Sequence, residues 1–259
     1  LRLAQPIPAI PVRLGTTIGT NALLEGKGTP SGLLVTSGFE DILTIGDQSR
    51  PQLFDLAITK NHWFDVKVAG VKGRLDADGH EIIPLDVPGV KATLAKLKTE
   101  GCKSPGICLM HSWNLAGAEE QSRPSHEQVV KDLALAAGFS DVIMSSEVAP
   151  TKGYLARAQT TSLNAYLDPM IRQWLEVLQQ ELGVAELRLM TSAGAVVKPD
   201  RFRGCHSILS GPAGGVVGAA QTGIASQSQN LLSFDMGGTS TDVARWNGSF
   251  DQRFKTPLK

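Results

Sequence analysis

Short apolar segments alternate with segments of helical periodicity along most of this 259-residue chain. Apolar runs such as Gly32–Thr36 and Gly106–Met110 have the composition of buried strands. The longest helical pattern runs from Tyr154 to Leu182, where leucines and other apolar residues recur on one helix face. Alternation of this kind predicts an α/β fold, in which helices pack on a mainly parallel or mixed sheet.

The other elements follow from the same periodicities and from glycine, proline and capping residues. Further strands are expected at Val12–Thr16, Asp141–Ser145, Leu187–Thr191, Ser207–Leu209 and Leu231–Asp235. Further helices are expected around Asn21–Glu25, over the positions Val90, Leu94 and Leu97, after the capping-box sequence that starts at Ser125, and at Gly211–Gly223. Pro169 is expected to kink the long helix or to split it in two. Residues 37–85 are expected to leave the main sheet and to form a hairpin around Asp78–Gly79.

Charge and hydropathy argue against several classes of partner. Lys plus Arg and Asp plus Glu both number 25, so no net charge attracts nucleic acid or an anionic membrane. No apolar run approaches the roughly 20 residues that cross a bilayer, and the proline-containing start does not resemble a signal peptide. Cys102, Cys108 and Cys205 are widely spaced, as is typical of reduced thiols. We therefore expect a cytoplasmic protein without nucleic-acid or membrane partners.

The motif that carries the most chemistry is Leu231–Asp242, with the sequence LLSFDMGGTSTD. Glycines in such a turn let a backbone approach a ligand, and its N–H groups and hydroxyls can form an anion-binding nest. The carboxylates of Asp235 and Asp242, one at each end, suit a phosphate that is bound to magnesium. The motif therefore predicts a nucleoside-triphosphate loop that lacks the lysine of the G-x-x-x-x-G-K-[ST] type. The alternative is a tight glycine-rich β-hairpin with capping hydroxyls.

Two further loops of glycine and hydroxyl residues each follow an expected strand. Gly15–Asn21 leads into a helix, whose free N–H groups make a natural anion site. The alternative is that Thr17 or Thr20 only caps the helix. Ser210–Gly215 also starts a helix, and its small residues allow close approach to a ligand. Close packing against a neighbouring helix would explain the same glycines.

Other candidates are weaker. The sequence Thr191–Gly194 follows a strand and could face the same cleft, although a plain turn would give the same pattern. Arg50 in a polar loop could recognise a carboxylate, but a surface ion pair is the commoner outcome. His111, one residue beyond an expected strand, is the histidine best placed for function. No metal-ligand spacing of histidines and no G-x-S-x-G elbow occurs.

Four motifs together resemble the hydantoinase A / 5-oxoprolinase family, and the last is most similar to the 5-oxoprolinase branch. They are GTTIGTNALLEGKG at Gly15–Gly28, TSGFEDILTIGDQSRPQLFDL at Thr36–Leu56, SGPAGGVVGA at Ser210–Ala219 and FDMGGTSTDVARWNG at Phe234–Gly248. The resemblance implies ribonuclease-H-like lobes, as in the actin, sugar-kinase and heat-shock ATPase superfamily, which close over ATP and magnesium. Family members use ATP to activate a cyclic amide for hydrolysis, or a ketone for carboxylation. In 5-oxoprolinase the product is L-glutamate.

From the resemblance and the loops we expect ATP and Mg²⁺ as cofactors. The residues expected to bind ATP are Gly15, Thr16, Thr17, Gly211, Gly214, Gly215, Gly237, Gly238, Thr239, Ser240 and Thr241. Asp235 and Asp242 are the expected catalytic and magnesium-binding residues. The Thr191–Ala195 loop departs from the family pattern, because relatives carry a polar residue and two glycines where this chain has Ala193.

The resemblance also implies a division of the chain. Residues 1–152 would be the remainder of a first ATPase-like lobe, with residues of about 37–85 inserted, and 153–259 a helical connection and the start of a second lobe. The chain would then be an internal fragment, inactive alone, of an enzyme that opens 5-oxo-L-proline to L-glutamate. Expected partners are a small cyclic amide and either further copies or a hydantoinase-B-type subunit or domain. The alternatives are an N-methylhydantoinase, an acetone or acetophenone carboxylase subunit, or a non-catalytic interaction fragment.

Overall fold

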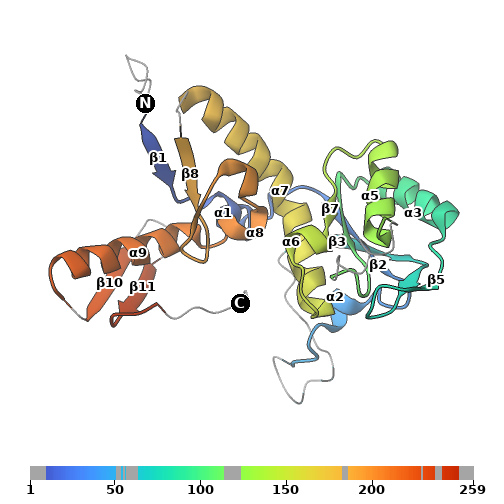
Figure 1. Ribbon diagram of the computed structural model, residues 1–259, viewed down its shortest axis with the longest axis horizontal. Helices are drawn as coiled ribbons and strands as arrows, with labels where there is room; N and C mark the ends of the chain where they lie inside the picture. The colour runs from blue at the N-terminus through green and yellow to red at the C-terminus, as the bar shows by residue number, and fades with distance from the viewer. Residues whose placement is uncertain are drawn as a thin grey trace. The chain divides into compact units, whose positions relative to one another are not determined.

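The chain forms two compact units in the computed structural model, which describes residues 10–50, 54, 56, 64–113, 124–182, 186–228, 230–236 and 241–250 (Figure 1). One unit, here called the parallel-sheet unit, is Ala22–Gln173. The other, the mixed-sheet unit, combines Leu1–Asn21 with Trp174–Lys259. This division differs from the expected one between residues 152 and 153, because strands from both ends of the chain pair in one sheet. The assignment of ATPase lobes to 1–152 and 153–259 stays a prediction.

Four parallel strands form the centre of the parallel-sheet unit, in the order β3-β2-β6-β7. Their bounds are Ser31–Thr36 for β2, Val66–Val71 for β3, Ser104–Cys108 for β6 and Ile143–Met144 for β7. All six residues of β2 are buried, as expected of a central strand covered on both faces. The predicted α/β class and parallel pairing are confirmed for this unit.

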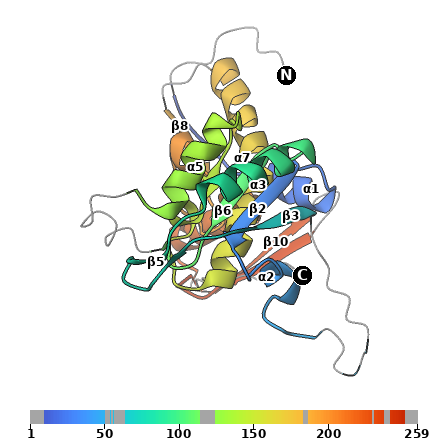
Figure 2. The same ribbon diagram turned by 90° about the vertical axis from the view of Figure 1, so that its right-hand side faces the viewer.

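Helices cover both faces of this sheet. One face packs against α3 (Val87–Thr99) and α5 (His126–Ala136), which lie side by side in Figure 2. The other face carries Leu33, Val35 and Cys108 against the start of α7. The shorter helices of the unit are α2 (Ile42–Ile45) and α6 (Ser145–Val148).

Capping residues and turns act where they were expected in this unit. The Ser125 hydroxyl accepts a hydrogen bond from the Gln128 backbone N–H at 3.2 Å, which caps α5. The strands β4 (Arg74–Leu75) and β5 (Glu81–Ile83) form an antiparallel hairpin. Its turn contains Gly79 at φ +89°, a conformation that glycine adopts without strain. The predicted hairpin is therefore confirmed. The expectation that residues 37–85 leave the main sheet is wrong in part, because β3 (Val66–Val71) lies within them and pairs in parallel with β2.

The mixed-sheet unit contains a three-stranded sheet in the order β1-β8-β9. The strand β1 (Pro11–Leu14) runs parallel to β8 (Glu186–Met190), and β9 (Val196–Val197) runs antiparallel to β8. A second, two-stranded sheet consists of β10 (Leu231–Met236) and β11 (Thr241–Trp246). The helices are α1 (Ile18–Leu24), the 3-10 turn Pro199–Arg201, α8 (Gly204–Ser207) and α9 (Ser210–Ala225).

One helix, α7, runs from Tyr154 to Leu182 without a break. Pro169 lies inside it, so the alternative of two separate helices is wrong. Leu167 and Ile171, on either side of the proline, are both almost completely buried. Packing therefore holds the helix together where a proline removes one backbone hydrogen bond. No helix among the described residues is long and apolar enough to cross a membrane.

Two strand predictions are wrong in detail. Ser207–Leu209 is not a strand, because Gly204–Ser207 forms helix α8 and Leu209 adopts φ +55° before α9. The Ser207 hydroxyl donates a 2.6 Å hydrogen bond to the Gly204 carbonyl, which supports the helical turn. The strand expected at Asp141–Ser145 is only Ile143–Met144, since Ser145 already starts α6.

Candidate functional site

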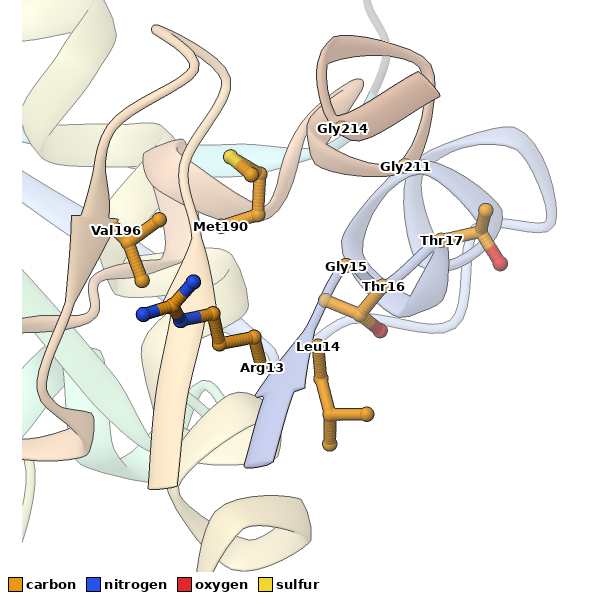
Figure 3. A pocket seen from close by; sticks show the side chains of 9 residues that line it. All are labelled: Arg13, Leu14, Gly15, Thr16, Thr17, Met190, Val196, Gly211 and Gly214. Carbon is orange, nitrogen blue, oxygen red and sulfur yellow. The ribbon is translucent and has the colours of Figure 1, made fainter. Parts of the chain in front are cut away.

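A pocket of about 480 Å³ lies in the mixed-sheet unit, where two of the predicted loops meet (Figure 3). Five of its lining residues were expected to bind ATP: Gly15, Thr16, Thr17, Gly211 and Gly214. Four lining residues were not expected: Arg13, Leu14, Met190 and Val196. The structure therefore brings together the loop after β1 and the start of α9. That these residues bind ATP stays a prediction.

The contact between the two loops is made by Ser210, whose side chain is fully buried. Its hydroxyl accepts a 3.2 Å hydrogen bond from the Thr16 N–H and donates a 2.8 Å hydrogen bond to the Thr16 carbonyl. One hydroxyl thus satisfies both backbone groups of a residue 194 positions away. Next to it, the Leu209 N–H donates to the Thr20 hydroxyl at 3.0 Å. Thr20 therefore bonds across to α8–α9 rather than acting only as a cap of α1.

The two loops come within van der Waals distance of each other at their glycines. A Cβ atom on Gly15 would lie 3.4 Å from the Gly211 Cα atom, and one on Gly211 would lie 3.3 Å from the Thr17 methyl group. A Cβ on Gly215, by contrast, would meet nothing within 4 Å. Gly215 is exposed and is not among the pocket residues. Its expected role in ATP binding stays a prediction without support from the pocket.

The pocket has two chemically different sides. Figure 3 shows Thr16 and Thr17 beside the two glycines of α9, on one side. The guanidinium group of Arg13 is turned to the other side, toward Met190 and Val196. Arg13 is the charged member of the lining. The first side offers hydroxyls and a helix N-terminus, which suit an anion. The second offers one cation on an apolar surface.

The two ends of the DMGGTSTD motif lie on the antiparallel strands β10 and β11. In the antiparallel register of β10 and β11, Asp235 lies directly opposite Asp242, and Met236 lies opposite Thr241. Gly237, Gly238, Thr239 and Ser240 are outside the described residues, so their expected contacts with phosphate stay a prediction. The pairing of β10 with β11 agrees both with a phosphate loop and with a tight glycine-rich hairpin, so it does not decide between the two.

The two aspartates project from the same face of this hairpin as Leu231 and Trp246. That face packs on α9, since a Cβ on Gly223 would clash with the Leu231 side chain. Like charges directly opposite each other across an antiparallel pair repel. A divalent cation between the two carboxylates would remove this repulsion, and carboxylate oxygens are the ligands that Mg²⁺ prefers. The pair therefore fits the expected magnesium role.

A separate group of possible metal ligands lies in the β4–β5 turn of the parallel-sheet unit. It consists of Asp76, Asp78 and His80, and it is the one such group of three within the described ranges. The Asp76 carboxylate accepts hydrogen bonds from the N–H groups of Asp78 and His80 at 2.9 and 2.8 Å. These bonds lower the pKa of Asp76 and explain the cluster as a turn that its own side chain stabilises.

The weaker candidates are not brought to the pocket. Thr191–Gly194 forms a hydrogen-bonded turn between β8 and β9, in which the Gly194 N–H donates to the Thr191 carbonyl at 2.9 Å. Only the residues that flank this turn, Met190 and Val196, line the pocket. Arg50 is exposed and His111 adopts φ +63°, and both belong to the other unit. The plain-turn alternative for Thr191–Gly194 is therefore the better description.

The residues that sequence reasoning missed lie on β1, β8 and β9. Arg13 precedes the predicted Gly15–Thr17 loop by two positions, which is the strand spacing that places two residues on one face. That spacing places Arg13 on the face of Gly15 but does not distinguish it from other strand arginines. Met190 and Val196 join the pocket only because β8 pairs with β1, and no short motif signals that pairing.

A buried polar network outside the pocket holds the end of β6. The Glu127 carboxylate accepts hydrogen bonds from the Leu109 N–H at 2.9 Å, the Ser145 hydroxyl at 2.6 Å and the Ser146 N–H at 3.0 Å. The Arg157 guanidinium donates to the Leu109 carbonyl at 2.5 Å. Burial raises the pKa of the Glu127 carboxyl above its usual value of 4.5. This network is a structural clamp in the core of the parallel-sheet unit.

Known protein families and proteins are similar to this chain in sequence. Residues 8–138 match the profile of the hydantoinase/oxoprolinase N-terminal region, and residues 157–258 match that of hydantoinase/oxoprolinase. 5-Oxoprolinase 1 of Arabidopsis thaliana is 38% identical over 95% of this chain, which spans 21% of that protein.

Two solved structures have the same fold. A nucleotide-free acetone carboxylase, described as carrying out ATP-dependent acetone carboxylation, matches with a TM-score of 0.75 and 25% identity over 93% of this chain and 36% of its own. The ATP-dependent caprolactamase from Pseudomonas jessenii matches with a TM-score of 0.70 and 29% identity over 89% of this chain and 34% of its own. The chain thus spans about a fifth to a third of the length of these proteins, and it belongs to the hydantoinase/oxoprolinase family.

Proposed function

We propose that this chain is part of an ATP-dependent hydrolase that opens 5-oxo-L-proline to L-glutamate. The observation that carries the proposal is the pocket in which Gly15–Thr17 and the start of α9 meet. Support comes from the 38% identity to a 5-oxoprolinase. Two structural relatives described as ATP-dependent act on a lactam and on a ketone, which share a carbonyl group that ATP can activate.

In this proposal the lactam oxygen attacks the terminal phosphate of ATP and ADP leaves. Water then adds to the activated carbon, and the C–N bond breaks to leave a free amine and an acyl phosphate. A second water hydrolyses the acyl phosphate to release phosphate and L-glutamate. Such a transfer depends on positioning and charge neutralisation rather than on a covalent protein partner. Thr16 and Thr17 would donate hydroxyl hydrogen bonds to phosphate, and Gly211 and Gly214 would let it approach the N-terminus of α9. Gly215 and the loop Gly237–Thr241 are assigned to the phosphates on the sequence motifs and the resemblance alone.

Asp235 and Asp242 would hold Mg²⁺, directly or through water, and orient the attacking group. A bound Mg²⁺ would supply neutralisation of phosphate charge. We also propose that the whole protein has ribonuclease-H-like lobes and assembles with further copies or with a hydantoinase-B-type subunit or domain. A cytoplasmic location is in keeping with its three free cysteines.

The first test replaces one carboxylate of the hairpin in the longest native polypeptide that contains this sequence. Asp235→Ala is expected to lower ATP-dependent release of glutamate from 5-oxoproline at least 100-fold, because it removes half of the proposed magnesium site. Asp200→Ala is the matched control, since Asp200 is an exposed aspartate of the same unit with only a 3.8 Å contact to Arg201. The melting temperature of both variants should stay within a few degrees of the parent. Full activity of Asp235→Ala would refute the assignment.

A second candidate is favoured by the match to acetone carboxylase, which has the higher TM-score of the two structures. Phosphate release measured with 5-oxoproline, hydantoins and acetone separates an oxoprolinase from an N-methylhydantoinase and a ketone-carboxylase subunit. Calorimetry with Mg-ATP tests the non-catalytic alternative, which predicts no heat of binding at micromolar nucleotide.

A further inference from the structure

Two arginines lie beside each other at the edge of the pocket. In the parallel register of β1 and β8, Arg13 is paired with Arg188, so the two side chains leave the same face of the sheet. The Arg188 guanidinium binds the Glu186 carboxylate at 2.7 Å. Arg13 makes no ion pair within the part of the chain that the structure describes, and it lines the pocket. The pocket therefore contains an uncompensated positive charge next to a second cation.

We propose that Arg13 binds the carboxylate of a cyclic-amide substrate and thereby selects acidic lactams over neutral ones. This inference rests on the proposed function, since it names the substrate class of the same pocket. A carboxylate at this position would neutralise Arg13 and could be held by two parallel N–H···O bonds.

The surface around Arg13 fits a small ring that carries such a group. The guanidinium group is turned toward Met190 and Val196 (Figure 3), which lie on the same face of the sheet as Arg13. Val196 is 41% exposed although it is an apolar residue beside a pocket. A lactam ring placed against these side chains would cover apolar surface while its carboxylate reaches the arginine. A bare phosphate would form an ion pair with Arg13 but would leave the apolar side chains exposed to water.

The opposite side of the pocket is left for the phosphoryl group. Thr16, Thr17 and the N-terminus of α9 supply uncharged donors there, away from the Arg13 guanidinium. A volume of about 480 Å³ accommodates both a five-membered lactam and a phosphate. The geometry thus separates a substrate side from a phosphate side, and the lactam oxygen would face the latter.

The test measures binding and turnover in the longest native polypeptide that contains this sequence. The ligands are 5-oxoproline and 2-pyrrolidinone, which share the lactam ring and differ in the carboxylate. The parent is expected to bind 5-oxoproline at least tenfold more tightly by calorimetry, and Arg13→Gln should remove this preference. A charge-assisted hydrogen-bond pair corresponds to roughly 10- to 100-fold in affinity. Arg13→Lys should retain part of the preference, because it keeps the charge but loses the planar fork.

Arg201→Gln is the matched control, because the Arg201 side chain is 82% exposed in the same unit. It should leave both affinities unchanged. The KM for ATP should stay within twofold in Arg13→Gln, since the phosphate side is intact. Equal loss for both lactams, no loss at all, or a selective rise in the KM for ATP would each overturn the assignment of Arg13 to a carboxylate. A parent that prefers 5-oxoproline through Arg13 but releases no glutamate would support this inference and refute the proposed function.

Discussion

Glu127 is a buried ionisable residue that holds the backbone just after strand β6. Its carboxylate and the Arg157 guanidinium bind the N–H and the carbonyl of Leu109. The residue after the next, His111, then adopts φ +63° at the end of β6. The sequence marked His111 as the histidine best placed for function, and the structure places it shortly after the clamped backbone of Leu109.

The raised pKa of Glu127 predicts a pH-dependent stability. Because the folded state favours the protonated carboxyl, the contribution of Glu127 is complete below pH 4.5 and is lost as the pH rises toward its folded-state pKa. The free energy of unfolding should therefore fall as the pH rises above about 4.5, by at most about 1.4 kcal/mol per pH unit. Glu127→Gln should lack this slope. Urea unfolding at several pH values measures both proteins, and parallel pH profiles would contradict the prediction.

At the residue scale, short motifs predicted half of the pocket. Gly15, Thr16, Thr17, Gly211 and Gly214 could be found because glycine and hydroxyl residues after a strand have a recognisable chemistry. Arg13 could not be predicted as a pocket residue in this way, because single arginines are common in strands. Its lack of an ion pair follows from the ion pair that Glu186 forms with Arg188 instead. Which charged side chains form ion pairs depends on the fold and cannot be read from a short stretch of sequence.

At the scale of elements, a glycine within a helix can lie either at a contact with another helix or on an open surface. Gly19 in α1 is buried, and a Cβ atom there would overlap the Ser207 hydroxyl of α8. Gly218 in α9 is exposed, and a Cβ there would meet nothing within 4 Å. The two positions have the same residue type in a helix but opposite surroundings.

This contrast predicts opposite effects of one substitution. Gly19→Ala should lower the free energy of unfolding by about 1–3 kcal/mol, because overpacking forces α1 and α8 apart. Gly218→Ala should raise it by about 0.5–1 kcal/mol, since alanine favours the helix and clashes with nothing. Chemical denaturation of the two variants beside the parent measures both effects. A stabilised Gly19→Ala would show that the α1–α8 contact is looser than the structure indicates.

Helices, strands and turns could be predicted where capping and turn residues determine them locally. They could not be predicted where contacts between distant residues determine them. The Asp78–Gly79 hairpin and the Ser125 cap have turn and cap residues that act on their own neighbours. Ser207–Leu209 looked like a strand because it is short and apolar at its end. Its helical turn instead depends on Ser207 bonding to Gly204 and on the contact with Gly19, which a periodicity cannot report.

At the scale of the whole molecule, the division into units could not be predicted from local patterns. The mixed-sheet unit joins the two ends of the chain through the pairing of β1 with β8. Such a pairing depends on contacts between segments that are distant in sequence. The parallel-sheet unit is one continuous segment, Ala22–Gln173, with buried clusters on both faces of its sheet.

The first part of α7 belongs to that continuous unit by its contacts. The Tyr154 hydroxyl accepts from the Thr36 N–H at 3.1 Å and donates to the Cys108 carbonyl at 3.0 Å, which links β2 to β6. Ala158 is completely buried against the same face as Leu33. A boundary after residue 152 would remove this cover and expose one face of the sheet.

We therefore predict that residues 22–173 fold as a separate polypeptide, whereas residues 22–152 do not. The longer segment should show a cooperative thermal transition and slow amide exchange in β2, because both faces of that strand stay covered. The shorter segment should lose the cooperative transition, since exposing a sheet face of large apolar side chains removes several kcal/mol from a marginal free energy of folding. Circular dichroism and hydrogen exchange followed by mass spectrometry measure the two segments side by side. Equal protection of β2 in both would instead place the boundary at residue 152, as the sequence suggested, and would make α7 dispensable to this sheet.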